Sequence, residues 1–495
     1  MKRQVSRRSL LKGLAIGGAG TMMAACQPKV VEVTSVVEKV VEKVVKETVM
    51  VEGTPQVVEK VVKETVIVEP EVAPEEPTEI SFEHFFANPE LWDFAFKPIF
   101  EYIEEEANVK MVHINVPYGD MMTKLLTMIA GGTPPDLTSL SSTATADIAS
   151  KGVLLPLDER VAVDPPCPLD DLMPSRMEDS TVNGKLFAMP IDQGSDAVFY
   201  NKEIFDKEGL PYPTADWTWD DLIELAQFLT VDGTGKRATD PGFDPDNIVQ
   251  WGYKSTNDAH RGYNIAASYG GDKMWFDKDV TKCRMDEPGV VEGLQFLVDL
   301  RCRYHVAPTA TQQTTIGDAA SGLQPFSLGY YAMEDTWVGL CSHMAREGVT
   351  VQDWDVVFRP KGKATTATSG GQGFPIIKDS QNHDKAWEVI KLFYTEEVMK
   401  MLGQGGAWMP ARISYAHWGR AEGGIPEHYV DAFVTPVAEY GFHKPWYLPG
   451  WLEWRRVIQS GLEPCWLCDA TAEEAVNGFI DEVNDMVAER EIIDI

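Results

Sequence analysis

The residues Ile80-Ser81-Phe82-Glu83-His84-Phe85 and Val109-Lys110-Met111-Val112-His113-Ile114-Asn115-Val116 each have the short, β-branched and aromatic pattern of a β-strand. An amphipathic helical pattern over 91–105 separates them, and a second helix over 121–130 leads to the turn Gly131-Gly132-Thr133-Pro134-Pro135 and a further strand. This alternation predicts an α/β fold, with parallel sheets covered by helices on both faces. In such sheets ligands bind at the carboxyl ends of the strands, often between two lobes.

The whole chain is long and strongly acidic. It has 495 residues, with 44 Lys+Arg against 76 Asp+Glu, and a formal net charge of −32. We therefore expect no nucleic-acid partner and no docking on anionic lipid, since both need a basic face. Hydrophobic residues at 44% and charged residues at 24% are typical of a globular protein. Chains longer than about 250–300 residues usually form more than one domain.

The N-terminus has the pattern of an export signal. A basic stretch up to Lys12 precedes an apolar, Gly-rich run that ends at Ala25, which is too short to span a bilayer. The Arg7-Arg8 pair resembles a twin-arginine signal. Met23-Ala24-Ala25-Cys26 resembles a lipoprotein cleavage site, although Met23 replaces the usual Leu. We expect residues 1–25 to be removed and Cys26 to carry lipid that holds the exported protein at the outer face of the cell membrane; a transmembrane anchor or a chance Cys is the alternative.

Six cysteines remain after such cleavage, and they permit up to three disulfides outside the cytosol. Six cysteines allow 15 connectivities, and the short loop between Cys283 and Cys302 favours that pair. Cys465 and Cys468 form a Cys-x-x-Cys, which could instead be a redox dithiol or half of a zinc site. The other two are Cys167 and Cys341.

Residues 26–79 form a spacer of Val, Glu, Lys, Thr and Pro without any aromatic residue after Cys26. The segment 40–52 recurs at 57–69 with the single change of Met50 to Ile67. The Val pairs recur every four residues, which is closer to a helical period, yet Val is a poor helix former, so both conformations stay open. A Pro-rich acidic linker ends at Pro77. As a random coil the spacer would let the body explore about 40 Å around its anchor.

Beyond residue 129 the chain contains several segments that together resemble one known family. The segments are Ile129-Ala130-Gly131-Gly132-Thr133-Pro134-Pro135-Asp136-Leu137, Gly152-Val153-Leu154-Leu155-Pro156-Leu157-Asp158, Asn183-Gly184-Lys185-Leu186-Phe187-Ala188-Met189-Pro190, 198–205, 217–222, 329–337, 369–376 and 386–393. Each segment is weak alone, but in this order they resemble the extracellular solute-binding proteins of ABC importers, family 1, the group of sugar binders related to maltose-binding protein. The spacer repeat and the cysteine pattern depart from that family.

The resemblance implies a two-lobed periplasmic-binding-protein fold of type II, with a mainly parallel sheet and flanking helices in each lobe. It places residues 80–192 and 374–405 in the first lobe and 196–369 and 410–495 in the second. The chain would cross between the lobes near 192–196, 369–374 and 405–410. The implied function is a monomeric binding component that captures a mono- or oligosaccharide by lobe closure and delivers it to a membrane permease. It implies no enzymatic activity, cofactor or metal.

A neutral sugar needs aromatic faces for its C–H surfaces and planar carboxylates or amides for its hydroxyl groups. Side chains of these kinds in strand-end loops and at the family's cleft positions are our candidates: His84, Asn88, Trp92, Ser141, Asp192, Gln193, Asp335, Trp337, Gly371, Gln372, Trp408 and Arg412. Each Trp could instead belong to the core, and His84 could be an ordinary loop residue. Trp446, Trp451 and Trp454 fit a packed helix face better than a wider cleft. We expect Asp136 to brace its loop.

Three alternatives remain from the sequence. A glycoside hydrolase could use Asp192 and Asp335 as its two carboxylates. Another solute, such as glycerol-phosphate, a peptide or an organic acid, would need cations in the cleft if it were anionic, and the candidate loops supply chiefly Arg412. The acidic turn Asp240–Asp246 could hold calcium, although a solvated loop is favoured because the order of ligands in an EF-hand is missing.

Overall fold

The computed structural model describes residues 37–51, 54–68, 76–86, 92, 96–256, 259–320, 323–344, 348–367, 369–404, 408–417, 426–441, 444 and 447–490. The signal segment and Cys26 lie outside the described residues. The chain divides into two compact units, residues 1–75 and residues 76–495.

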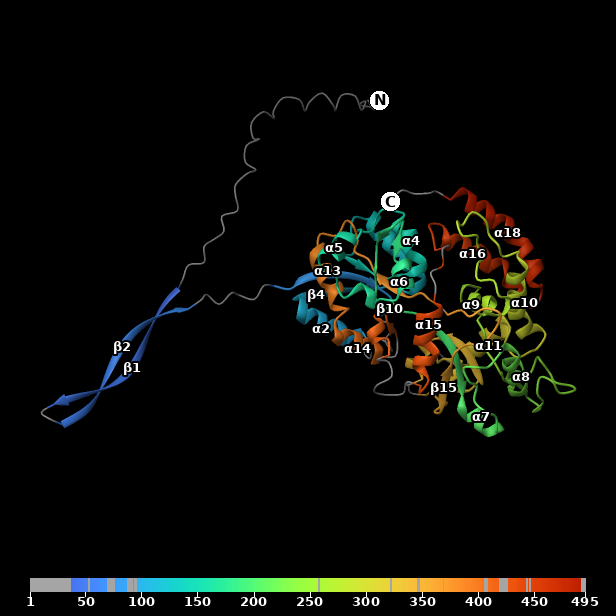
Figure 1. The fold of residues 1–495 in the computed structure, drawn as a ribbon, viewed down its shortest axis with the longest axis horizontal. Coiled ribbons are helices and arrows are strands. Elements are labelled where there is room, and N and C mark those ends of the chain that lie inside the picture. The colour runs from blue at the N-terminus through green and yellow to red at the C-terminus, as the bar shows by residue number, and fades with distance from the viewer. Residues whose placement is uncertain are drawn as a thin grey trace, which may run out of the picture. The chain divides into compact units, whose positions relative to one another are not determined.

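The first unit contains a two-stranded antiparallel hairpin, β1 (Val37–Val51) and β2 (Thr54–Val68), drawn in blue in Figure 1. Each strand carries one copy of most of the repeat. The register places Glu42 opposite Lys63 and Lys46 opposite Glu59, so that opposite charges face each other across the ladder. β-Branched Val favours this conformation over the helix that the four-residue spacing allowed. A random coil is therefore the wrong description of residues 37–51 and 54–68.

The first lobe of the second unit is built on a parallel sheet with the order β4-β3-β5. The central strand β3 (Thr78–His84) pairs in parallel with β4 (Val109–Asn115) and β5 (Leu137–Thr138), as the alternating pattern predicts. Phe82 lies at the centre of the core, with ring centroids 5.9 Å from Phe100 and 4.9 Å from Phe374. The helices of this lobe are α2 (Lys97–Ala107), α3 (Met121–Ala130), α4 (Ser142–Ala149), α5 (Asp158–Val163), α6 (Pro174–Asp179), α13 (His383–Leu392) and α14 (Glu396–Gln404).

The second lobe has a three-stranded antiparallel sheet instead of the mainly parallel one that the family resemblance implies. Strand β11 (Asp196–Asn201) lies between β14 (Met333–Trp337) and β15 (Trp354–Val357) and is antiparallel to both. The reason is topological: β11 enters the lobe directly from the crossover, whereas β14 returns to it, so Asp196 pairs with Trp337. The helices include α7 (Lys202–Glu208), α8 (Trp219–Leu229), α9 (Ala259–Gly270), α10 (Pro288–Cys302), α11 (Ala310–Ala319), α12 (Leu340–His343), α15 (Thr435–Tyr440), α16 (Trp451–Gly461), α17 (Glu463–Trp466) and α18 (Ala472–Glu489).

The described residues of the segments that the resemblance gives as connections between the lobes lie side by side. Strand β10 (Asp192–Gln193) pairs antiparallel with β17 (Met409–Pro410), and the Gly194 N–H donates to the Gly370 carbonyl at 2.6 Å. Next to them β16 (Gln372–Phe374) pairs with β6 (Leu140–Ser141) and β9 (Met189–Pro190). Residues from all three expected crossovers thus meet in one hydrogen-bonded layer, and the two-lobed α/β architecture is confirmed.

The disulfide joins Cys302 to Cys468, with their Cα atoms 5.6 Å apart, so the expected Cys283–Cys302 pair is wrong. Helix α10 occupies most of the sequence between Cys283 and Cys302. At 1.5 Å per residue, the two ends of this helix are roughly 20 Å apart. Cys283 is a buried thiol, as are Cys167, Cys341 and Cys465. Because Cys468 is oxidised to Cys302, the Cys-x-x-Cys segment is neither a dithiol nor a zinc half-site in this structure.

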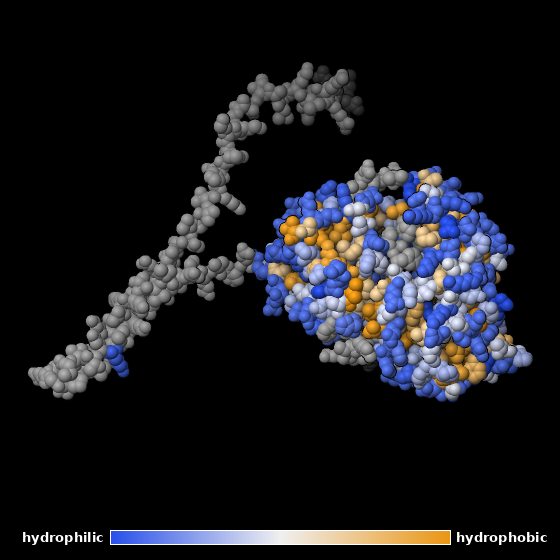
Figure 2. All heavy atoms as spheres, in the orientation of Figure 1, coloured by the Kyte–Doolittle hydropathy of each residue, from blue (hydrophilic) through white to orange (hydrophobic). Residues whose placement is uncertain are grey.

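Hydrophilic side chains cover most of the visible face of the body, with hydrophobic ones interspersed among them (Figure 2). This distribution agrees with the acidic composition of the chain, whose formal net charge is −32. Among the described residues, none of the helices combines the length and the apolar character that crossing a membrane requires.

Candidate functional site

The carboxyl ends of the parallel strands of the first lobe meet at one edge of the sheet. Tyr118, which follows β4, is 55% exposed, and its ring contacts Phe85 edge-on with a centroid distance of 5.2 Å. After β5, the Ser139 hydroxyl donates to the Gln372 side-chain carbonyl at 3.3 Å, and Gln372 pairs with Ser141 across β16 and β6. This edge therefore offers aromatic faces beside hydroxyl and amide groups.

Tyr118 and Phe85 were missed by the sequence analysis, although the same strand-end argument that selected His84 applies to them. Of the predicted residues, Ser141 and Gln372 are at this edge. Ser141 is half-buried, and its hydroxyl shares a 2.8 Å hydrogen bond with Thr143 at the start of α4.

Two buried side chains near the strand ends and the crossovers have acceptors without a hydrogen-bond partner among the described residues. Oε1 of Glu83 and Oε1 of Gln193 are both in this state, and neither residue has exposed surface. The other carboxylate oxygen of Glu83 accepts from Thr138 at 2.8 Å, and burial raises the pKa of Glu83 to about 7. Unsatisfied buried acceptors are the places where a water molecule or a ligand hydroxyl would bind.

Asp192 and Gly371 brace the layer between the lobes. The Asp192 carboxylate accepts the Gln372 N–H, Arg176 donates to the Asp192 carbonyl at 3.0 Å, and burial raises the pKa of Asp192 to about 6. Gly371 has φ 150°, and a Cβ atom there would lie 2.6 Å from an Asp192 carboxylate oxygen, so only glycine fits. Both predicted residues are thus committed to the crossover itself.

Asp335 lies in β14 and is paired with Arg359 of the same lobe. The Arg359 guanidinium donates to its two carboxylate oxygens at 2.6 and 2.7 Å and also reaches Asp196 at 3.2 Å. Beside this network is a cavity of about 20 Å³, lined by Asp196, Lys254, Thr256, Asp335 and Thr336. That space holds about one water molecule, so a sugar ring cannot enter it.

Trp337 follows Asp335 at the end of β14 and is half-buried. Its ring belongs to the second lobe by sequence but packs against the hydrophobic core of the first lobe. Trp337 is thus the predicted aromatic residue that lies between the lobes.

His84 is fully buried in the first lobe. Its Nε2 is 2.9 Å from Nδ1 of His113, its Nδ1 accepts the Phe86 N–H at 3.1 Å, and Trp92 stacks on its ring at 5.7 Å. Burial, followed by the proximity of His113, lowers the pKa of His84 to about 3. The structure therefore places His84 and Trp92 in a packed aromatic group, while Asn88 lies outside the described residues.

Trp408 and Arg412 are also structural in this conformation. Trp408 packs edge-on against Phe86 and Phe96 at 4.8 and 4.9 Å. Arg412 donates to the Asp171 carboxylate at 2.7 Å and to the Tyr394 carbonyl at 2.8 Å. Arg412, the cation that the sequence analysis considered for an anionic solute, is thus already paired with Asp171.

The second lobe contributes a buried cation and aromatic rings close to the crossovers. The Lys444 ammonium donates to the Ser369 carbonyl at 3.0 Å and lies 5.8 and 5.3 Å from the ring centroids of Tyr263 and Tyr447. Burial lowers the pKa of Lys444 to about 8. Trp451 and Trp454 are buried in the core of this lobe, as the helix-face interpretation predicts; Trp446 lies outside the described residues.

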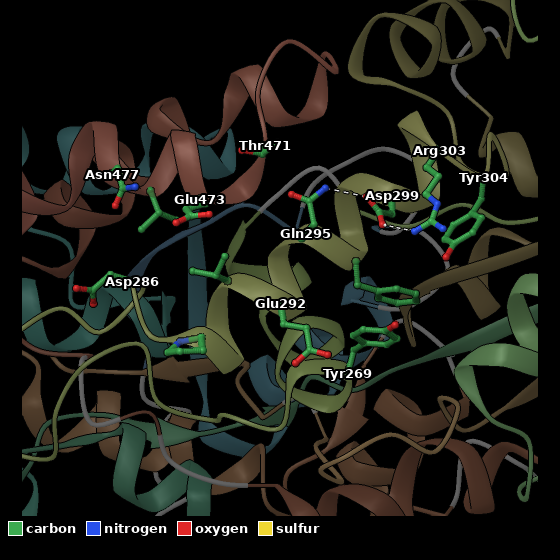
Figure 3. A pocket seen from close by; sticks show the side chains of 14 residues that line it. Tyr269, Asp286, Glu292, Gln295, Asp299, Arg303, Tyr304, Thr471, Glu473 and Asn477 are labelled. Carbon is green, nitrogen blue, oxygen red and sulfur yellow. Dashed lines mark hydrogen bonds and ion pairs between the residues drawn. The ribbon is translucent and has the colours of Figure 1, made fainter.

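A separate groove of about 620 Å³ runs between α10 and α18 on the second lobe (Figure 3). Figure 3 shows Gln295, Asp299 and Arg303 along α10, linked by hydrogen bonds and ion pairs, with Glu473 and Asn477 opposite them. Three of its carboxylates are paired with cations, namely Asp286 with Lys282, Glu292 with Lys363 and Asp299 with Arg303. None of the predicted binding residues lines this groove.

The acidic turn at 240–246 is held by hydrogen bonds to its carboxylates. Asp232 accepts the N–H groups of Thr234, Lys236 and Asp244, and Asp240 accepts that of Arg237. These contacts favour the solvated loop over a calcium site. Within the described part of the chain, only Asp355, Glu427 and His428 bring three possible metal ligands together, and His428 is engaged with Asp355 at 2.7 Å.

Asp136 braces its loop, as the sequence predicts. Its carboxylate accepts from the Ser81 N–H and hydroxyl, both at 2.7 Å, and from the Ser380 hydroxyl at 2.6 Å.

Residues 94–400 match the family model of the bacterial extracellular solute-binding proteins. The chain belongs to this family. The matched region contains β4, β5, β11 and β14, whereas β3 and Phe85 lie before it.

Curated and solved relatives of this solute-binding protein agree with that assignment. A binding protein of Brucella abortus is 22% identical over 389 residues, which are 75% of this chain and 85% of the relative. The maltotriose-binding protein of Pyrococcus abyssi is 26% identical over 318 residues, 63% of this chain and 61% of that protein. The structure of an ABC substrate-binding protein from Listeria monocytogenes in complex with cycloalternan aligns with a TM-score of 0.66 and 24% identity, covering 84% of this chain and all of that one.

Proposed function

We propose that this solute-binding protein captures a neutral mono- or oligosaccharide between its lobes and delivers it to the permease of an ABC importer. The observation that carries the proposal is the strand-end edge of the first lobe. The aromatic pair Phe85 and Tyr118 follows β3 and β4, and the group of Ser139, Ser141 and Gln372 lies after β5. Flat rings and nearby hydroxyl and amide groups are what a sugar needs. The maltotriose-binding and cycloalternan-bound relatives support the same solute class.

The charges around the crossovers favour a neutral solute. Arg359 is paired with Asp335 and Asp196, Arg176 with Asp179, and Arg412 with Asp171. An anionic solute such as glycerol-phosphate would have to break one of these pairs to gain an arginine, which costs several kcal/mol when the pair is buried. The buried Lys444 is likewise engaged, with the Ser369 carbonyl and two tyrosine rings.

The structure narrows the contacts that we propose. Trp337, Ser141 and Gln372 remain from the sequence-based set, and Tyr118 and Phe85 join them. Gln193 remains because its Oε1 is unsatisfied. We leave out the residues that are engaged in the crossover, the ion pairs or the core, which are His84, Trp92, Asp192, Asp335, Gly371, Trp408 and Arg412.

The same contacts argue against a glycoside hydrolase. Asp335 is held by Arg359. Asp192 is held by the N–H of Gln372, and it lies so close to Gly371, the residue before Gln372, that only glycine fits there. Neither carboxylate is placed to protonate or attack a glycosidic bond, and the characterised relatives are binding proteins.

Export and anchoring belong to the same proposal. A twin-arginine signal and a lipid on Cys26 would place the protein at the outer face of the membrane as a monomer beside its permease, and the hairpin of residues 37–68 would form part of the tether.

A thermal-shift screen over maltose, maltotriose, arabinooligosaccharides, amino acids and glycerol-phosphate tests the solute class. We expect a sugar to raise the melting temperature, because ligand binding to the folded state alone stabilises it, and we expect no sugar to be consumed. Stabilisation by an anion or an amino acid and by no sugar would refute the proposal, and steady product release would show an enzyme.

Two variants test the site with the stabilising sugar. Trp337→Ala and Tyr118→Ala should each weaken binding by about tenfold, since loss of one aromatic contact typically costs 1–2 kcal/mol. The matched control is Tyr440→Ala, which removes a 41% exposed tyrosine of α15 and should bind sugar as the unmodified protein does. Equal affinity in all three variants would show that the sugar binds elsewhere.

A further inference from the structure

Helix α16 of the second lobe begins without a side-chain cap from its own lobe. Its N-cap residue is Gly450, which has φ 94° and no side chain that could accept a hydrogen bond from the first helical N–H groups. The first N–H groups of a helix have no partner within the helix, and a helix of 11 residues loses stability when they stay unpaired.

Asp147 of the first lobe fills this position. One carboxylate oxygen accepts the Gly450 N–H at 2.6 Å, and the other accepts the Leu452 N–H at 3.4 Å. Asp147 lies in α4, which packs on β6 and β16 of the first lobe, whereas α16 packs on α18 and α9 of the second. Figure 1 shows α4 and α16 facing each other from the two lobes.

A hydrophobic contact accompanies the cap. Leu452 packs both against its own core and against the cluster of the first lobe that contains Leu125, Leu140 and Ile148. The two contacts join the same short segment of α16 to the same lobe, and both are lost if the lobes separate.

We infer that Asp147 and the first turn of α16 form a latch between the lobes, whose closure sets how tightly the protein holds its ligand. The inference rests on the proposed function, because it treats lobe closure as the binding step. A carboxylate at a helix N-terminus is favoured by the aligned peptide dipoles as well as by the hydrogen bonds.

The latch is suited to reopen. Burial raises the pKa of Asp147, although the two N–H groups and Lys151 act in the opposite direction. Bringing this carboxylate out of water therefore opposes the hydrogen bonds that it forms. A contact of this kind is weak enough for the closed lobes to release a ligand to a permease, and strong enough to shift their equilibrium.

Hydrogen exchange of the ligand-free, full-length protein tests the latch without any sugar. In Asp147→Ala the amides of Gly450 and Leu452 should exchange on the order of tenfold faster, because loss of the carboxylate leaves both N–H groups open to water. Amides deeper in α16 and in α18 should be unchanged. Asp147→Asn, which keeps the shape and removes the charge, should show a smaller change at the same two amides.

The matched control is Glu453→Gln. Glu453 lies in the first turn of α16 and repels the Asp147 carboxylate, so its loss changes the charge near the helix end while both hydrogen bonds between the lobes keep their donors and acceptors. Unchanged exchange at Gly450 and Leu452 in both Asp147 variants would overturn the inference, as would an equal acceleration in Glu453→Gln. If Asp147→Ala speeds exchange throughout both lobes, the variant is destabilised as a whole. Exchange at Gly450 and Leu452 in Asp147→Asn then supports or overturns the inference.

A second measurement connects the latch to binding. With maltotriose, or whichever sugar the screen identifies, Asp147→Ala should raise the dissociation constant about tenfold, chiefly through faster release, while Glu453→Gln leaves it unchanged. If no sugar binds, the proposed function fails and the exchange result still stands. If sugar binds equally tightly to Asp147→Ala, the latch does not control affinity and this inference fails alone.

Discussion

Arg359 holds the carboxylate of Asp335 with two hydrogen bonds, 2.6 Å from Nε to Oδ2 and 2.7 Å from Nη2 to Oδ1. The same Nη2 reaches Asp196 at 3.2 Å, and all three side chains are buried. Asp196 begins β11 and Asp335 lies in β14, so one guanidinium joins neighbouring strands of the second lobe where they meet the crossover.

Arg359→Met should strongly destabilise the second lobe. The substitution removes the cation that is hydrogen-bonded to both buried carboxylates, which typically costs about 3–5 kcal/mol. Urea unfolding followed by tryptophan fluorescence measures the loss. Lys361→Met is the control, since its pair with Asp216 is exposed and surface pairs contribute less than about 1 kcal/mol. A similar small effect in both variants would show that the Arg359 network adds little.

The disulfide should matter for stability, and the buried thiols should not be oxidised. Peptide mapping without reductant should yield one cross-linked pair, Cys302 with Cys468. Cys468→Ser should lower the free energy of unfolding by about 2–4 kcal/mol, because the bond closes a long loop in the unfolded chain. Cys283→Ala changes a buried thiol outside this bond and should leave the mapping unchanged. Recovery of a Cys283–Cys302 peptide would contradict the structure.

His84 should make the first lobe sensitive to acid. Its pKa is about 3 when folded and close to 6.5 when unfolded, so between these values the unfolded chain binds the additional proton. This contribution leaves stability unaffected above pH 6.5 and lowers it as the pH falls toward 3, by about 3 kcal/mol at pH 4.5.

The difference between the unmodified protein and His84→Gln isolates that contribution. The difference in the free energy of unfolding between the two proteins, measured in urea, should be constant above pH 7. As the pH falls below 6.5, the unmodified protein should lose stability relative to the variant. A difference that stays constant from pH 8 to pH 4.5 would mean that His84 is protonated within the fold.

Cys26→Ser tests the anchor. The variant should be exported but recovered in the soluble fraction and unlabelled by fatty acid, because the thiol that receives the lipid is missing. Cys283→Ser, a substitution of a cysteine far from the signal, should remain with the membrane. Fatty-acid labelling of Cys26→Ser would refute lipidation at this position.

The alternating pattern around β3 was sufficient to predict the parallel sheet of the first lobe, since hydrophobic periodicity is a local property. The antiparallel placement of β11 was not predictable in this way, because it depends on where the chain crosses between lobes. The disulfide was misjudged for a similar reason: the segment from Cys283 to Cys302 looks like a short loop until 15 of its residues are known to form the helix α10.

The candidate site shows the same limit. Residue type and position identified Gln372, Ser141 and Trp337 near the strand ends, yet could not reveal that Asp335 is occupied by Arg359 or that His84 points into the core. Such facts depend on partners more than twenty residues away in sequence. Tyr118 could have been found from the sequence, because it comes soon after the end of β4, just as His84 stands at the end of β3.

The pairing of Val37 with Val68 has a consequence for the tether. Because the two strands of a hairpin run in opposite directions, β1 and β2 begin and end close together. They therefore add residues to the spacer but almost nothing to its end-to-end distance. If the proposed lipid on Cys26 holds the protein at the membrane, deleting the hairpin should leave the distance that the body can reach from its anchor nearly unaltered, whereas the same number of residues added as a coil would increase it.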